Sequence, residues 1–211
     1  MIGFSALIVV GMSLFISLKT GVYFLVIIIF PVTLSIIAPF FDTPFLKKSG
    51  DLMYHSTLFL SEKLKKGVIT IHGGTLLDYV FVIDRKMSGK QRTTFIVQQY
   101  VEGLLALIEQ YENRKFGNIR IRGTSYIINQ RTAQRVGFKI VRTDYIQKLI
   151  LTYNYFNILI TYSIAKDKLS FPKLRETMTF ETNLSDLVER KKSIRELNET
   201  LKGSLAKNPV T

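Results

Sequence analysis

The 211-residue chain lacks cysteine and tryptophan and contains only two histidines, His55 and His72. Without cysteine it forms no disulfide, thiolate zinc site, iron–sulfur cluster or cysteine nucleophile. A catalytic zinc commonly takes three protein ligands, and no cluster of acidic residues accompanies either histidine in the sequence. We therefore expect no metal cofactor.

Two catalytic signatures are also missing from the sequence. No Gly-x-Ser-x-Gly nucleophile elbow occurs. The segment MSGKQRT, residues 87–93, lacks the glycine that a Walker loop places five residues before its Gly-Lys pair. These absences exclude a P-loop nucleotide hydrolase and a serine hydrolase built on that elbow.

Charge is nearly absent from residues 1–41, where Lys19 is the only charged residue. All 16 acidic residues and all but one of the 29 basic residues follow residue 41. An excess of positive charge favours anionic partners, which include phospholipid headgroups, phosphorylated cofactors and nucleic acid. Since no nucleic-acid-binding motif with interleaved aromatics occurs, we expect membrane lipids with anionic headgroups as partners and disfavour nucleic acid.

Two apolar runs account for the uncharged start of the chain. Ile2–Leu18 is a run of 17 apolar or small residues and Val22–Phe41 a run of 20, separated by a three-residue turn. At about 1.5 Å per helical residue, each run approaches the thickness of the bilayer hydrocarbon. We predict a two-helix transmembrane hairpin over residues 1–41, ended by Pro39 and Pro44, with a re-entrant hairpin as the alternative.

Lysines follow the second apolar run closely, whereas the turn between the runs has one lysine. The positive-inside bias therefore predicts an inner or plasma membrane location with the soluble domain facing the cytoplasm. These lysines also favour contact with anionic lipid, at roughly 1 kcal/mol each near the surface. The helical pattern of residues 51–66 predicts a basic linker helix within residues 42–67. The lysines that follow the second apolar run are Lys47, Lys48, Lys63, Lys65 and Lys66.

Residues 68–175 predict an α/β domain. Residues 68–84 are rich in β-branched and aromatic residues around a Gly-Gly pair and predict two strands, the second over Tyr79–Asp84. An apolar stripe over residues 91–115 predicts a long helix. A strand, a short helix capped by Asn129 and another strand follow over residues 118–144. This alternation is typical of an α/β sandwich.

Two further segments are helical by pattern. Residues 145–169 are mostly apolar and aromatic but include Asn154 and Asn157. They predict a helix packed on the sheet or lying on the bilayer surface, with a third crossing as the alternative. Residues 176–211 predict a C-terminal amphipathic helix, near heptad spacing, and a loose tail. Such a helix docks on its own domain or pairs with a partner helix.

The order of strand, loop, long helix, strand and short helix over residues 68–143 resembles the GNAT acyltransferase family. In that family a glycine-containing loop after the central strand holds the coenzyme A pyrophosphate, because free amides at the next helix amino terminus favour anions. The matching loop here is Arg85–Arg92, which keeps Gly89 but has Gln91 in place of a second small residue.

A second motif carries the same resemblance. The family has an Asn followed by a helix that ends in Gly-Phe, and Asn129 precedes Gly137-Phe138 here. Ala133 stands where the family often has a Tyr that serves as general acid. From the residues alone, Gly137 is also explained as the left-handed end of a helix, and Asn129 as its amino cap.

The resemblance implies acyl transfer from acetyl-CoA or another acyl-CoA to an amine. Asp84 and His72 are the candidates for the base that takes the amine proton. The implied cofactor-binding residues are Arg85, Lys86, Ser88, Gly89, Lys90, Gln91, Arg92 and Asn129.

The alternative hypothesis is a membrane-anchored interaction or assembly protein without catalytic activity. The substituted glycine loop and Ala133 favour it. In this hypothesis the basic domain and the C-terminal helix hold a protein partner.

Overall fold

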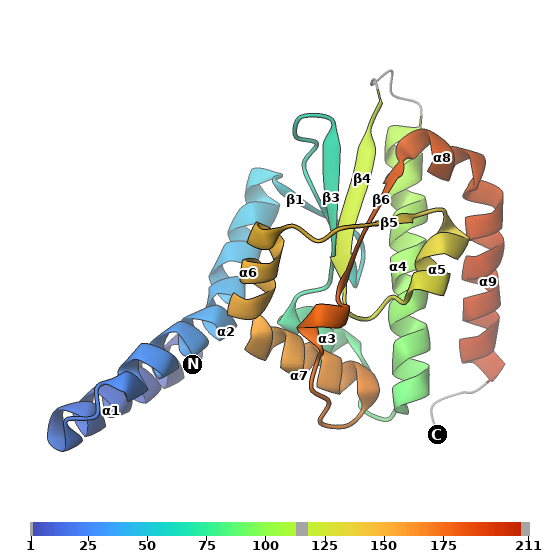
Figure 1. Ribbon diagram of the computed structural model, residues 1–211. Coiled ribbons are helices and arrows are strands. Elements are labelled where there is room, and N and C mark those ends of the chain that lie inside the picture. Colours follow the sequence, from blue (N-terminus) through green and yellow to red (C-terminus); the bar gives the residue numbers. More distant parts are fainter. Residues whose placement is uncertain (1, 113–117, 208–211) are drawn as a thin grey trace.

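The computed structural model describes residues 2–112 and 118–207, with residues 2–7, 25, 39 and 40 described by their backbone alone. It contains a mixed α/β domain and a helical hairpin that projects from one side of the domain (Figure 1). The hairpin consists of α1 (Ile2–Thr20) and α2 (Phe24–Ser49), which lie antiparallel. Gly21, with φ of 73°, lies in the turn between them, where a left-handed conformation favours glycine.

Burial in the hairpin is the reverse of burial in a soluble helix pair. Ser13, Ser17 and Ser35 are buried, as small residues are where helices approach closely in membranes. Phe15 and Ile27 point outward and are 63% and 71% exposed. In the part of the chain that is described, the helical segment Val26–Ser49 of α2 is long and apolar enough to cross a membrane. The apolar segment Ile8–Thr20 of α1 is shorter.

Helix α2 continues through Pro39 and Pro44 to Ser49, so the predicted end of the second helix is wrong. A proline cannot donate a backbone hydrogen bond to the carbonyl four residues earlier. For Pro39 that carbonyl belongs to Ser35, and the Asn157 side-chain amide donates to it at 2.6 Å. A neighbouring helix thus supplies a donor where the proline removes one.

The domain is built on a six-stranded sheet with the strand order β1-β2-β3-β4-β6-β5. Within the described ranges, β3 and β4 are the only parallel neighbours, and the other neighbouring pairs are antiparallel. The strands are β1 (Leu52–Ser56), β2 (Phe59–Glu62), β3 (Val68–Gly73), β4 (Arg120–Ser125), β5 (Lys139–Val141) and β6 (Met178–Asn183).

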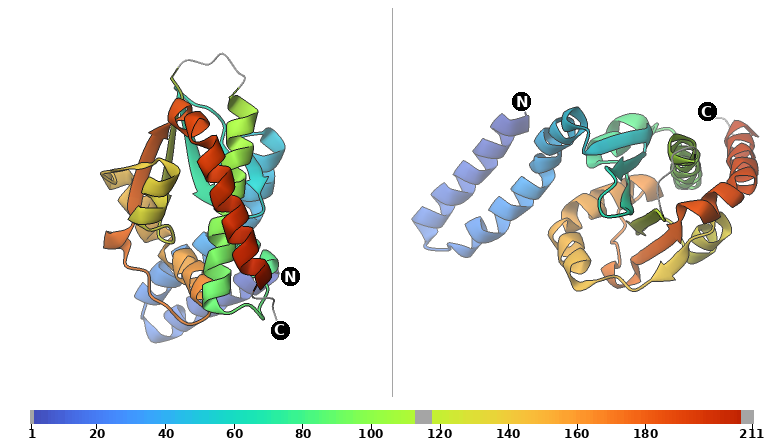
Figure 2. Two further views of the ribbon diagram at one scale, coloured as in Figure 1. Left: turned by 90° about the vertical axis from the view of Figure 1, so that its right-hand side faces the viewer. Right: turned by 90° about the horizontal axis from the view of Figure 1, so that it is seen from above.

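Helices cover both faces of the sheet (Figure 2). Helices α4 and α9 lie on one face and α6 on the other, and α7 crosses the end of the sheet, where it contacts α2, α3 and α4. The helices of the domain are α3 (Leu76–Val82), α4 (Gly89–Tyr111), α5 (Gln130–Val136), α6 (Tyr145–Tyr153), α7 (Tyr155–Lys166), the 3₁₀ turn Leu174–Glu176, α8 (Leu184–Glu189) and α9 (Lys191–Lys207).

The core lies between the sheet and α4, whose apolar stripe includes the fully buried Leu107 and Ile108. Helix α9 packs along α4 through Ile194 and Leu197, and the buried Gln98 side chain donates to Asn198 at 3.1 Å. The described part of the C-terminal helix therefore docks on its own domain.

Several predicted elements are confirmed. The long helix is α4, and the strand, short helix and strand that follow are β4, α5 and β5. Asn129 caps α5, because its side-chain oxygen accepts the Thr132 amide at 2.9 Å. Residues 113–115 of the predicted long helix and residues 208–211 of the predicted tail lie outside the described residues.

The linker helix predicted within residues 42–67 is wrong, since β1 and β2 form a hairpin there. Phe59, Leu60 and Ser61 are buried in succession, which suits a strand covered on both faces. Because β1, β2 and β6 all belong to the sheet, the α/β domain extends beyond the predicted bounds of 68–175.

The strand predicted over Tyr79–Asp84 is also wrong, because Leu76–Val82 is helix α3. Thr75 and Asp78 form a reciprocal capping box that starts this helix. Residues 145–169 contain two helices that meet at Asn154 instead of one continuous helix.

Candidate functional site

The two parallel strands separate toward their carboxyl ends. β3 and β4 are paired from Val68 with Arg120 to Ile71 with Gly123. Beyond this point β3 stays paired with β2, through His72 and Gly73, and β4 stays paired with β6. In open α/β sheets, ligands bind in the crevice outside the carboxyl ends of the strands. The separation therefore marks the first place to look for a site.

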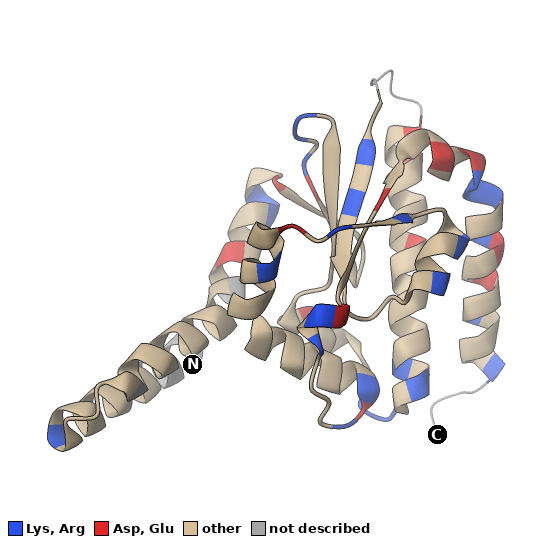
Figure 3. Cartoon of the chain, viewed as in Figure 1, with Lys and Arg blue, Asp and Glu red and all other residues tan. Residues whose placement is uncertain are grey.

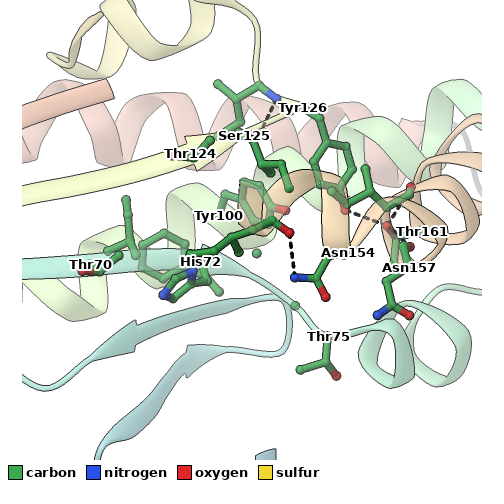
Figure 4. A pocket seen from close by; sticks show the side chains of 18 of the residues that line it. Thr70, His72, Thr75, Tyr100, Thr124, Ser125, Tyr126, Asn154, Asn157 and Thr161 are labelled. Carbon is green, nitrogen blue, oxygen red and sulfur yellow. Dashed lines mark hydrogen bonds between the residues drawn. The ribbon is translucent and has the colours of Figure 1, made fainter. Parts of the chain in front are cut away.

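A cavity of about 840 Å³ lies at these strand ends (Figure 4). Its volume is within the range of small-molecule sites, about 300–1,000 Å³. The residues that line it come from the ends of β3 and β4, from α4 and α5, and from α2, α6 and α7. They are largely apolar with a few polar groups, which include Thr70, His72, Tyr100, Thr124, Ser125, Tyr126, Asn154 and Asn157.

His72 forms the one imidazole–carboxylate pair of the described cavity lining. Its Nε2 lies 3.0 Å from the Glu62 carboxylate on the neighbouring strand β2, and both side chains are partly exposed. Hydrogen bonding to His72 lowers the pKa of Glu62 below its ordinary value. A carboxylate in this position orients the imidazole. The pair therefore has the properties of a general base and the group that orients it.

Two tyrosines of the cavity lining keep their protons at neutral pH. Burial raises the pKa of Tyr126 to about 12 and also raises the pKa of Tyr100. The Tyr126 hydroxyl lies 2.6 Å from the Thr161 hydroxyl, and the Tyr100 hydroxyl lies 2.8 Å from that of Tyr79. Protonated hydroxyls at the strand ends can donate hydrogen bonds to an anion or a developing negative charge.

The structure places the two predicted catalytic residues apart. His72 lines the cavity, and its partner is Glu62 and not Asp78 or Asp84. Asp84 is exposed beyond the end of α3, where it accepts the Lys86 amide at 2.9 Å. Asp84 does not line the cavity and has a turn-forming role. The predicted position of Asp84 at a strand end is wrong, because the residues before it form helix α3.

The predicted phosphate loop Arg85–Arg92 follows α3 and not the central strand. Gln91 accepts hydrogen bonds from the Ser88 amide and hydroxyl, both at 2.8 Å, which completes the capping box of α4. The buried Arg92 side chain donates to three backbone carbonyls and pairs with Asp167 at 2.9 Å. These groups hold the turn between α3 and α4 against the end of α7.

Gly89 is required at this turn because a Cβ there would collide with the Lys166 carbonyl. Lys86, Lys90 and Arg85 are exposed beside it. No residue of this loop lines the cavity as far as the structure describes it. The loop that follows the central strand β3 is Gly73-Gly74-Thr75, which does line the cavity.

Asn129 is exposed and acts as the α5 cap, and Gly137, with φ of 107°, ends the same helix. Both keep a structural role. The residues between them approach the cavity, since Thr132, Ala133 and Val136 line it. Asn129 and Gly137 therefore fix the two ends of a helix that forms part of the cavity wall.

Sequence reasoning missed Glu62, Tyr100 and Tyr126. One signal was available, because a Gly-Thr pair occurs near the carboxyl end of each parallel strand, Gly74-Thr75 directly after β3 and Gly123-Thr124 within β4. Small residues at two strand ends are typical of a site where a ligand approaches the backbone. The pairing of Glu62 with His72 depends on the β2–β3 register, which the sequence did not indicate.

No group of three His, Cys, Asp or Glu side chains with metal-binding geometry occurs among the residues that the structure describes. Comparisons with known proteins found no matching family model, no matching curated protein and no matching solved structure.

Proposed function

We propose that this chain is a membrane-anchored acyltransferase of GNAT type, which transfers an acyl group from coenzyme A to an amine in the cavity at the β3 and β4 ends. The observation that carries the proposal is the separation of the only parallel strand pair in the described sheet beyond Ile71 and Gly123. The resemblance implies a cofactor cleft between two strands that part in this way. The cavity lies where these strands separate, and residues of the loop Arg85–Arg92 do not line it.

The cavity suits the acyl-bearing arm of the cofactor. Its lining is largely apolar, with hydroxyl groups of Thr124, Ser125 and Tyr126 at the strand end. Exposed Arg131 and Arg135 flank the cavity-lining residues of α5 and supply positive charge for phosphate groups outside it. When bound, acyl-CoA would supply an activated thioester carbonyl.

In the proposed reaction, the amine nitrogen forms a bond to the thioester carbonyl carbon, and the carbon–sulfur bond breaks. His72, oriented by Glu62, takes the amine proton. The leaving sulfur takes a proton and departs as the free thiol, and the hydroxyls of Tyr100 or Tyr126 are placed to donate a hydrogen bond to it. The products are an amide and coenzyme A.

Membrane anchoring through α1 and α2, with the domain on the cytoplasmic side, is part of the proposal. Its support is the outward-facing apolar surface of the hairpin, the near absence of charge along it (Figure 3) and the lysines that follow. A partner held by the C-terminal helix has less support, because α9 already buries its apolar face on α4.

The binding test uses the full chain in detergent micelles and isothermal titration with coenzyme A and acetyl-CoA. Val97 lines the cavity, and Val97→Phe should fill part of it and weaken binding by at least tenfold. Val188→Phe on α8 is the matched control, because Val188 is 37% exposed and lies away from the cavity lining. Absence of binding, or equal binding by both variants, would refute the proposal.

The catalytic test compares the two histidines. His72→Gln should lower acyl transfer to amines by about 10²–10⁴-fold, the usual contribution of a general base. His55→Gln is the control, since His55 lies 2.7 Å from the Ser61 hydroxyl and does not line the cavity. Equal activity of the two variants would remove His72 from the mechanism.

A further inference from the structure

The cavity is not enclosed by the α/β domain alone. One of its walls belongs to α2, the helix with a segment long and apolar enough to cross a membrane. Helices α6 and α7 also line the cavity, through residues that include Gln147, Ile150, Tyr153 and Asn154. The residues contributed by α2 are Ser35, Ala38, Asp42, Thr43 and Leu46.

Asp42 is the only acidic residue in the first 50 residues of the chain. It lines the cavity directly after the apolar run of α2. The Asp42 side chain is exposed, and within the described part of the chain its carboxylate has no ion pair or hydrogen bond. A solvent-exposed carboxylate that lines the cavity and has no protein partner can pair with a cationic ligand group.

The rim of the cavity on this side is apolar. Ile150 and Tyr153 of α6 line the cavity and are 48% and 51% exposed, and Leu46 of α2 also lines it and is 37% exposed. Exposed apolar side chains at the edge of a cavity suit a hydrocarbon chain and not a fully water-soluble ligand.

We infer that the cavity takes a long-chain amphiphile with an ammonium headgroup, which enters from the bilayer between α2 and α6. The headgroup binds the Asp42 carboxylate, and the chain lies along the apolar rim. This inference rests on the proposed acyl transfer in one respect, because it identifies the amine acceptor as a membrane amphiphile. The ammonium loses one proton before it attacks, and the products are a long-chain amide, coenzyme A and that proton.

The test is amphiphile binding without any acyl-CoA, so that its outcome is independent of the transfer reaction. The full chain in nonionic detergent is incubated with dodecylamine, or with dodecanoate of the same chain length, and native mass spectrometry counts the molecules retained. We expect retention of dodecylamine and at least tenfold weaker retention of dodecanoate. Equal retention of both would overturn the inference.

Two matched pairs of variants locate the site. Asp42→Asn should weaken dodecylamine retention about tenfold, whereas Asp51→Asn should not, because Asp51 accepts from Ser49 and lies outside the cavity lining. Ile150→Trp should obstruct the rim, whereas Ile146→Trp, one helical turn earlier and 69% exposed, should not. Equal effects within either pair would refute the assigned entrance.

The two proposals fail separately. Dodecylamine retention that depends on Asp42, together with no acetyl-CoA binding, would remove the acyltransferase and keep the amphiphile site. Acetyl-CoA binding and transfer to a water-soluble amine, with no dodecylamine retention, would keep the enzyme and remove the amphiphile.

Discussion

The hairpin and the α/β domain bury opposite kinds of side chain. In the hairpin the buried side chains include Ser13 and Ser17, and Ile27 is 71% exposed. In the domain Ile108 is fully buried, and the described lysines and arginines other than Arg92 are partly or fully exposed. Water drives apolar side chains inward, whereas lipid tails give no such force and leave close approach of small residues to hold helices together. This contrast is what the proposed membrane anchoring of the hairpin requires.

The candidate site lies where these two regions meet. Its polar groups, His72 and Glu62, belong to the sheet, and part of its wall belongs to α2. In the proposed membrane-anchored arrangement, a cavity at such a junction has access to water-soluble and membrane-borne molecules. The predictions that follow concern side chains of the domain, side chains of the hairpin and the contact between hairpin and domain.

The largest difference is expected from one substitution made in each region. Ile108→Ala removes a fully buried side chain and should destabilise the domain by about 2–5 kcal/mol. Ile27→Ala should change the same quantity by less than about 0.5 kcal/mol, because its side chain already faces outward. Thermal unfolding of the full chain in detergent measures both. Similar losses would mean that Ile27 is packed against protein.

A charge on the hairpin tests the lipid-facing surface directly. Ile27→Asp should oppose membrane insertion by about 2.5–3.5 kcal/mol, if residue 27 lies near the bilayer centre, and shift the chain out of the membrane fraction. Val188→Asp, at an exposed position on α8, is the control and should leave the fraction unchanged. Unchanged membrane association of both variants contradicts a crossing by α2.

The contact between hairpin and domain includes the hydrogen bond from the Asn157 side chain to the Ser35 carbonyl. Asn157→Leu removes the donor to the Ser35 carbonyl, which Pro39 leaves without a helical amide. An unsatisfied buried acceptor costs about 1–3 kcal/mol, so hydrogen exchange in α2 near residue 39 and in α7 should accelerate.

Asn154→Leu serves as the control for that change. The Asn154 side chain also donates to a carbonyl, that of Ile150, but this bond is exposed and lies within α6. Exchange in α2 should therefore stay at the wild-type rate. Equal acceleration by both variants would show that Asn157 has no special part in joining the two regions.

The sequence predicted the elements whose pattern is local. An uninterrupted apolar stripe predicted α4, and the Asn129 cap with Gly137 predicted α5, because each signal lies within one helix. The apolar runs predicted the hairpin helices, but not the continuation of α2 past Pro39, which depends on Asn157. That donor lies more than a hundred residues away and has no local sequence signal.

Interactions between distant elements also explain the errors at the site. Residues 76–82 have a composition that suits a strand, and the Thr75 capping box with burial of Tyr79 makes them a helix. Because these residues form helix α3, the predicted phosphate loop Arg85–Arg92 follows a helix and not a strand of the sheet. His72 was found because it follows a β-branched run, whereas Glu62 required the register of β2 against β3.

The smallest effect is expected from the Glu62–His72 pair on the domain side of the junction. Both side chains are partly exposed, so the pair should contribute only about 0–1 kcal/mol to stability. The lowered pKa of Glu62 fixes the direction, because the folded state binds its proton less readily than the unfolded state. This contribution is present above the ordinary glutamate pKa of 4.5 and is lost as pH falls through the lower folded pKa. Glu62→Gln removes it, so the difference in unfolding temperature between wild type and variant should shrink as pH falls below 4.5. A difference that grows as pH falls below 4.5 would mean that Glu62 binds its proton more readily in the folded state, and Glu62 would then not orient His72 as a carboxylate.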